Sequence, residues 1–302
     1  MQTQNRQRKS IAYSQNFLRS RGLIAELIHK SSITQDDIVY EIGSGEGIIT
    51  QELAKQCKQV VSIEIDQELH SKLLPKLAEF GNAQIVLGDF LVYRLPNNSY
   101  KVFSNIPFNI TSQVVRKLTQ AQFPPLDAYL IMQLEAAEKF GGSSCDAKET
   151  QFSILIKPWF ELEVVHKFKR TDFYPVPSVD TVLLRLRKRD KSLVQQTDKQ
   201  LYEDFIVYAF SQWKPTLREG LRLVFTNNQY ARLATNFKLP NNAVPTQLDF
   251  NQWLGLFSYF SQSVDDTRKQ VVAGSAMKQS QEQAKLQKIN RTRKDSNWRR
   301  KK

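Results

Sequence analysis

Short apolar runs alternate with amphipathic segments through the first half of this 302-residue chain. The runs have the length of buried strands, and the segments between them repeat apolar residues at helical spacing. The strand candidates are residues 38–42, 60–65, 84–87, 101–104 and 128–132, and the helix candidates are residues 23–29, 48–55, 67–80, 112–120 and a segment from Glu135. This alternation predicts an α/β domain in which helices cover both faces of a parallel sheet.

The second half of the chain has a different pattern. Residues 159–168 and 179–186 are β-rich runs that we expect to add to one edge of the sheet, and residues 198–260 have helical spacing. After Ser263 the chain is rich in Gln, Lys, Arg and Ser, a composition that does not form a packed core. We therefore predict a basic N-terminal segment (1–22), an α/β domain (23–192), a helical domain (193–264) and a disordered basic tail (265–302).

The net charge of +13 is concentrated at the two ends. Residues 267–302 hold twelve basic and two acidic residues, residues 1–22 hold five basic residues and no acid, and the residues between them sum to −2. Basic ends on a nearly neutral body favour a polyanionic partner, most plausibly nucleic acid. A tail that only improves solubility is the alternative.

Several classes of protein are not indicated. No apolar run approaches the ~20 residues of a membrane span, and the N-terminus has no apolar signal-peptide core. Cys57 and Cys145 make no disulfide framework, so we expect a reducing cytoplasm and no membrane association. The three histidines are too scattered to indicate a metal site.

A glycine-rich turn, Gly43-Ser44-Gly45-Glu46-Gly47, follows the first strand of the α/β domain. Glycines at that place let a ligand approach the backbone. Glu64 ends the second strand, where an acid can bind the two hydroxyls of a ribose. Asp89 follows the third strand and could accept from an adenine amine. Both acids could instead cap the next helices. The set predicts a nucleoside cofactor: NAD remains possible, and S-adenosylmethionine is favoured because this turn makes no provision for a pyrophosphate.

The fourth strand leads into Asn105-Ile106-Pro107-Phe108. The Asn105 side-chain oxygen and the Ile106 carbonyl, kept out of a helix by Pro107, could accept from both N–H groups of an aromatic amine. Such hydrogen bonds turn the amine lone pair out of the ring plane and make it more nucleophilic. Phe108 could stack on the base. The alternative is an ordinary strand end with a proline turn and a buried ring.

These motifs together resemble those of the ribosomal RNA adenine dimethyltransferases. The similar segments are residues 14–18, 41–47, 64–66, 105–110 and 173–180, within a resemblance that covers roughly residues 10–260. Ile106 and three C-terminal segments look like the Erm branch, which modifies one adenine of 23S RNA; these segments are residues 213–214, 224–229 and 250–254. The tail after Thr267 departs from the shorter family members.

The resemblance implies a Rossmann-like, S-adenosylmethionine-dependent methyltransferase with a small C-terminal helical domain. It assigns the cofactor pocket to Asn16, Leu18, Gly43, Glu64, Asp89 and Asn105, and the target adenine to Asn105, Ile106, Pro107 and Phe108. The implied enzyme is a monomer that methylates protein-free 23S rRNA or the assembling large subunit, and confers macrolide–lincosamide–streptogramin B resistance. The alternatives are a 16S rRNA adenine dimethyltransferase and a non-catalytic RNA-binding relative.

Overall fold

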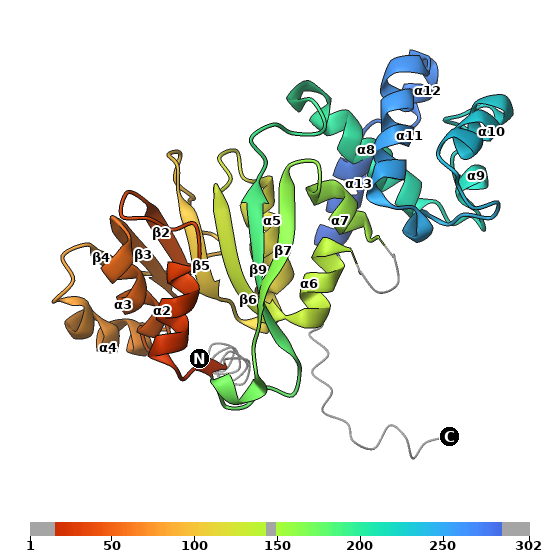
Figure 1. Ribbon diagram of the computed structural model, residues 1–302. Coiled ribbons are helices and arrows are strands. Elements are labelled where there is room, and N and C mark those ends of the chain that lie inside the picture. Colours follow the sequence, from red (N-terminus) through yellow and green to blue (C-terminus); the bar gives the residue numbers. More distant parts are fainter. Residues whose placement is uncertain (1–15, 143–148, 286–302) are drawn as a thin grey trace. The chain divides into compact units, whose positions relative to one another are not determined.

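A computed structural model describes residues 16–142 and 149–285 of the chain (Figure 1). By its internal contacts the chain divides into two units, residues 1–196 with 246–250, and residues 197–245 with 251–302. Ser14, Gln15, Cys145 and residues 286–302, which the sequence analysis discussed, lie outside the described residues. Within residues 16–142 and 149–285, no helix is both long and apolar enough to cross a bilayer.

The first unit contains a seven-stranded sheet with the order β4-β3-β2-β5-β6-β9-β7. The strands are β2 (Ile38–Ile42), β3 (Gln59–Glu64), β4 (Ala83–Leu87), β5 (Lys101–Asn105), β6 (Asp127–Gln133), β7 (Phe160–Lys167) and β9 (Thr181–Lys188). The five strands from β4 to β6 are parallel, whereas β9 pairs antiparallel with both β6 and β7. The predicted parallel sheet with two strands added at one edge is confirmed.

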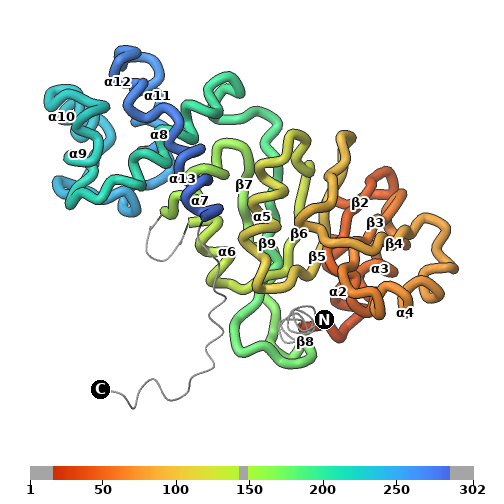
Figure 2. The backbone as a smooth tube through the Cα atoms, turned by 180° about the vertical axis from the view of Figure 1, so that it is seen from behind, coloured from red at the N-terminus to blue at the C-terminus, as the bar shows by residue number. Residues whose placement is uncertain are grey.

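Helices cover both faces of the sheet because its central strands are apolar on both sides. Val39 and Phe103 belong to one core together with buried residues of α2 (Arg21–His29) and α3 (Ile48–Gln56); Figure 1 shows these two helices beside the sheet. Tyr40 and Val102 face the opposite core. That second core contains residues of α5, α6 and α7, and Figure 2 shows this side. The helices not yet bounded are α4 (Gln67–Leu77), α5 (Thr111–Gln120), α6 (Leu134–Gly141) and α7 (Gln151–Ile156).

The strand order places a crevice at one point of the sheet. From β2 the chain moves outward to β3 and β4, then returns to β5 on the other side of β2. The loops that follow β2 and β5 therefore leave the same edge in opposite directions, which is where open α/β sheets bind ligands. The glycine-rich turn follows β2, and the Asn105–Phe108 segment begins at the last residue of β5.

A second, two-stranded sheet was not predicted. β1 (Phe17–Leu18) pairs antiparallel with β8 (Phe173–Tyr174), and the Arg19 N–H donates to the Asp172 carbonyl at 2.9 Å. Two-residue strands are too short to show an alternating pattern. This pairing joins the N-terminal segment to the proline-rich loop before β9.

The second unit is helical, in agreement with the prediction. Its helices are α8 (Lys199–Ser211), α9 (Leu217–Gly220), α10 (Asn227–Asn236), α11 (Phe250–Ser263), α12 (Asp266–Gln270) and α13 (Ser275–Lys285). Aromatic rings form its core: Phe205 stacks on Phe260 with centroids 4.7 Å apart, and Tyr202 meets the Phe257 ring edge-on at 4.9 Å. Single 3-10 turns elsewhere in the chain span Phe108–Ile110, Arg170–Asp172, Gln196–Asp198 and Pro245–Gln247.

We predicted that a disordered tail begins at residue 265. This is wrong for residues 266–270 and 275–285, which form α12 and α13. Asp265 caps α12 by accepting the Arg268 N–H, and Val272 is fully buried. The buried carboxylate of Asp204 on α8 accepts the N–H groups of Gly274 at 3.0 Å and Ala276 at 2.8 Å. A helix cap and hydrogen bonds to a carboxylate some seventy residues away produce no apolar periodicity, so the sequence pattern did not indicate these helices.

We predict that Asp204→Ala loosens α13, because it removes both hydrogen bonds to the start of that helix. The free energy of unfolding should fall by about 1–3 kcal/mol, the usual size for bonds to a charged group. Hydrogen exchange should show faster exchange at residues 274–278, and chemical denaturation gives the stability. Asp266→Ala, which truncates an exposed carboxylate, is the control. Unchanged exchange in Asp204→Ala would show that α13 is held by other contacts.

Candidate active site

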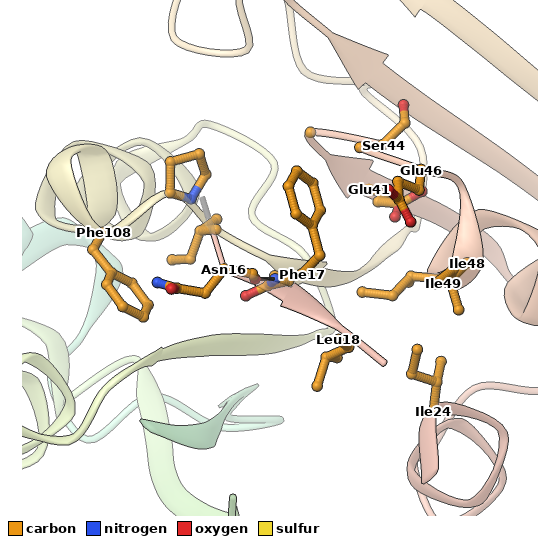
Figure 3. Close-up of a pocket in the computed structure, with 15 residues that line it drawn as sticks. Asn16, Phe17, Leu18, Ile24, Glu41, Ser44, Glu46, Ile48, Ile49 and Phe108 are labelled. Atoms are coloured by element: carbon orange, nitrogen blue, oxygen red, sulfur yellow. Dashed lines mark hydrogen bonds between the residues drawn. The ribbon is translucent and has the colours of Figure 1, made fainter. Parts of the chain in front are cut away.

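A pocket lies between the N-terminal strand, the glycine-rich turn and the loop after β5 (Figure 3). Its lining residues are Asn16, Phe17, Leu18, Ile24, Glu41, Gly43, Ser44, Gly45, Glu46, Ile48, Ile49, Asn105, Ile106, Pro107 and Phe108. Seven predicted site residues, from three separate segments of the chain, therefore meet here; they are Asn16, Leu18, Gly43, Asn105, Ile106, Pro107 and Phe108. Glu64 and Asp89 are not part of this lining.

The glycine-rich turn presents bare backbone to the pocket. Gly43 has φ +77°, and a Cβ added there would meet nothing within 4 Å. Gly47 has φ +82° just before α3, and a Cβ there would lie 2.1 Å from a Leu73 methyl carbon. The turn is thus fixed by packing at Gly47 and open to a ligand at Gly43.

Glu64 fixes the glycine-rich turn through a hydrogen bond to its backbone. Its buried carboxylate accepts the Gly45 N–H at 3.0 Å and the Asp66 N–H at 2.9 Å. Asp66, not Glu64, caps α4 by accepting the N–H groups of Glu68 and Leu69. The helix-capping interpretation of Glu64 is therefore wrong.

Asp89 is half-buried in the loop after β4. Its carboxylate accepts the Leu91 N–H at 2.8 Å, which forms a local turn. Its position next to the third strand agrees with the sequence, but its side chain supports the loop in this structure. The assignment of Asp89 to an adenine amine stays a prediction.

Glu41 is a buried carboxyl group at the pocket wall that the sequence analysis did not select. The hydroxyls of Thr50 and Ser62 donate to one of its oxygens, the latter at 2.8 Å. The pKa of Glu41 is raised to about 8, mainly by burial; the two hydroxyl hydrogen bonds oppose this rise, and the nearby Glu64 charge adds to it. An acid near the end of an otherwise apolar strand was the signal that could have identified it.

Asn105 connects the strand end to the N-terminal segment. Its Nδ2 donates to the backbone carbonyl of Asn16 at 2.7 Å. Only the NH₂ group can donate to a carbonyl, so this bond fixes the orientation of the amide and leaves Oδ1 as its acceptor. Ile106 is buried, and within residues 16–142 and 149–285 no hydrogen bond to its carbonyl is found. Two acceptors of the predicted kind therefore lie at the carboxyl end of β5.

The two aromatic rings of the pocket occupy different places. Phe108 is half-buried. The alternative interpretation, an ordinary proline turn, had required a buried ring. Phe17, which the sequence analysis missed, covers the glycine-rich turn: a Cβ on Gly45 would lie 2.9 Å from its ring. Figure 3 shows the Phe17 ring between Ser44 and Phe108. Its place between Asn16 and Leu18 was the available signal.

We predict that the Glu41 carboxyl makes stability fall as the pH rises. Its folded pKa of about 8 exceeds the ordinary 4.5, so between these values the folded protein keeps a proton that the unfolded chain has lost. Stability from this group is complete below the unfolded pKa and is lost as the pH approaches 8. The advantage of Glu41→Gln over the wild type should therefore grow from about pH 5 to about pH 8 in urea denaturation. Exposed Glu46 provides the control Glu46→Gln, and a pH-independent difference for Glu41→Gln would contradict the assignment.

Comparison with known proteins agrees with this geometry. The family model for ribosomal RNA adenine dimethylases matches residues 6–262. An rRNA adenine N-6-methyltransferase from Saccharopolyspora erythraea is 32% identical over 258 residues, which cover 85% of this chain and 67% of that protein. A ribosomal RNA small subunit methyltransferase A from Bacillus cereus is 32% identical over 216 residues, which cover 68% of this chain and 74% of that protein.

Among solved structures, the 23S rRNA methyltransferase ErmE matches with a TM-score of 0.75 and 32% identity, covering 82% of this chain and all of that chain. The predicted Rossmann-like methyltransferase fold and the resemblance to Erm-type rRNA adenine methylases are confirmed. The chain belongs to the ribosomal RNA adenine dimethylase family.

Proposed function

We propose that this rRNA adenine N6-methyltransferase uses S-adenosylmethionine to methylate the exocyclic amine of one adenine in 23S rRNA. The observation that carries the proposal is the amide of Asn105, oriented by its hydrogen bond to the Asn16 carbonyl, beside the Ile106 carbonyl and Phe108. Resistance to macrolide, lincosamide and streptogramin B antibiotics is the consequence that we propose for this modification.

The pocket suits a cationic nucleoside. Gly43 exposes its backbone, and Ile24, Ile48 and Ile49 supply apolar walls. The Glu41 carboxyl lines the pocket, and the Glu64 carboxyl accepts a backbone N–H of the turn. S-adenosylmethionine would supply an electrophilic methyl group on a positively charged sulfur, taken up directly by the adenine amine with no covalent intermediate on the protein. Glu64 supports this site by holding the Gly45 backbone, and its contact to a ribose remains part of the proposal.

Asn105 and Ile106 would hold the amine. The Asn105 Oδ1 and the Ile106 carbonyl each accept one N–H, which turns the lone pair toward the methyl donor. Pro107 keeps the Ile106 carbonyl available because no helix can continue through it. Fixed acceptors of this kind lower the barrier by positioning and by stabilising the positive charge that grows on nitrogen.

Phe108 would stack on the adenine after the base has left its helix or stack. Among the described residues that line the pocket there is no His or Lys, and the buried acid Glu41 has a raised pKa. We therefore propose that no side chain acts as the base: the amine becomes acidic once methylated, and its extra proton leaves to water.

The nearest rival is a 16S rRNA adenine dimethyltransferase. Support for 23S rRNA comes from the longer match to the Saccharopolyspora relative, 85% of this chain against 68% for the small-subunit enzyme at the same identity. The likeness to ErmE also supports it. The test is methyl transfer from labelled cofactor to protein-free 23S and 16S RNA, with the modified base mapped. Transfer to 16S RNA alone would establish the rival, and no transfer to either would indicate a non-catalytic relative.

We predict that Phe108→Ala slows methyl transfer at limiting RNA by roughly five- to 150-fold, because base stacking on an aromatic ring is worth about 1–3 kcal/mol. Phe108→Tyr keeps the ring face and should stay close to the wild type. Calorimetry should show unchanged S-adenosylmethionine affinity in both variants, which separates base stacking from cofactor binding. A normal rate in Phe108→Ala would remove the stacking role.

A further inference from the structure

Trp213 lies two residues after the end of α8 and is 99% exposed. Within residues 16–142 and 149–285, no ring contact or hydrogen bond of its side chain is found. Trp253 in the same unit is fully buried, and its Nε1 donates to the Pro245 carbonyl at 3.3 Å. A single exposed apolar side chain is ordinary, so the neighbours of Trp213 decide whether it has a function.

Three exposed cations follow Trp213 in the chain: Lys214, Arg218 and Arg222. Among the residues that the structure describes, none of the three forms an ion pair. The Arg222 charge acts on the Tyr208 hydroxyl, where it opposes the rise in the Tyr208 pKa that burial causes. Arg222 therefore lies close to Tyr208 in the last turn of α8, and Trp213 follows two residues after that helix ends. Glu219 is the acidic residue in this stretch, so positive charge predominates.

The backbone beneath these side chains is firmly held. The Leu217 N–H donates to the Ala243 carbonyl at 2.7 Å, and Thr216 caps α9 by accepting the Glu219 N–H. Leu217 is buried, and Gln212 packs so closely on Gly220 that an added Cβ would lie 3.2 Å from it. A fixed loop presents its side chains without a large entropic cost on binding.

We propose that Trp213, Lys214, Arg218 and Arg222, the Trp213 surface, form a second RNA-binding site that stacks one unpaired base and holds its flanking phosphates. The ligand rests on the proposed function, since an rRNA substrate supplies both chemistries. Indole stacking accepts any base, and Arg and Lys bind phosphates without reading sequence. Bases in a duplex are stacked on each other, so the site selects an unpaired nucleotide. Its residues belong to the second unit, and the residues of the proposed target-adenine pocket belong to the first.

The first test measures binding of the full chain to an unpaired RNA oligonucleotide and to a duplex of the same sequence. Trp213→Ala should bind the unpaired RNA about five- to 150-fold more weakly, and Trp213→Phe should retain most of the affinity. Quenching of tryptophan emission by the RNA should be smaller in Trp213→Phe than in the wild type although binding persists. Phe123→Ala, which truncates a half-exposed ring of the first unit, is the matched control and should bind normally.

The second test concerns the three cations. Replacing Lys214, Arg218 and Arg222 together by Gln should reduce the slope of log affinity against log salt by about 2, because each phosphate contact on a single strand contributes roughly 0.7. Lys72→Gln, which removes a surface charge paired with Glu68, should leave the slope unchanged. In methyl transfer, the Trp213 and cation variants should raise the KM for RNA and leave kcat and S-adenosylmethionine affinity unaltered.

Normal RNA affinity and normal KM in a folded Trp213→Ala would overturn the proposal, whichever RNA the wild type methylates. A wild type that modifies only 16S RNA contradicts the proposed function, while Trp213-dependent binding of unpaired RNA would still support the second site. Equal loss of unpaired and duplex binding would overturn the stacking role. A wild type whose self-association depends on Trp213, with RNA binding unaffected by its replacement, would identify a protein interface and also overturn the proposal.

Discussion

The hydrogen bond from the Asn105 amide to the Asn16 carbonyl, 2.7 Å long, is the constraint on which the pocket depends. It joins the end of β5 to an N-terminal segment more than eighty residues away in the sequence. The β1–β8 pairing also holds this segment, through Phe17 and Leu18. One bond therefore attaches the segment that carries Phe17 to the strand end, and it also fixes the Asn105 amide so that its oxygen is left to accept from a substrate amine.

The opposite wall depends on buried carboxyl groups. Glu64 accepts two backbone N–H groups, one of them from Gly45, and so fixes the glycine-rich turn. In this turn Gly43 faces open space. Glu41 lies beside it, kept largely protonated at neutral pH by burial. A positively charged ligand above the turn would favour ionised carboxylates there, so the chemistry of the wall matches the sulfonium cofactor that we propose.

Much of this arrangement follows from local patterns. The strands and helices of the α/β domain were predicted because each apolar run is long enough to show its period. Gly43 and the Asn105–Phe108 segment were predicted because they stand at the ends of parallel strands, whereas Asn16 and Leu18 were implied by the family resemblance. The actual place of Glu64 could not be predicted, since the same acid can face a ribose or the backbone of the turn. The β1–β8 pairing and helices α12 and α13 also escaped, because they rest on two-residue strands, caps and the Asp204 contact rather than on periodicity.

The most direct test of this account is Asn105→Asp, which keeps the size of the side chain and an acceptor oxygen but removes the donor. A carboxylate placed against the Asn16 carbonyl cannot form the bond and would be repelled by it. S-adenosylmethionine affinity by calorimetry and the single-turnover rate of methyl transfer should both fall in a variant whose fold is intact. Wild-type affinity together with a wild-type rate would contradict the claim that this hydrogen bond builds the pocket.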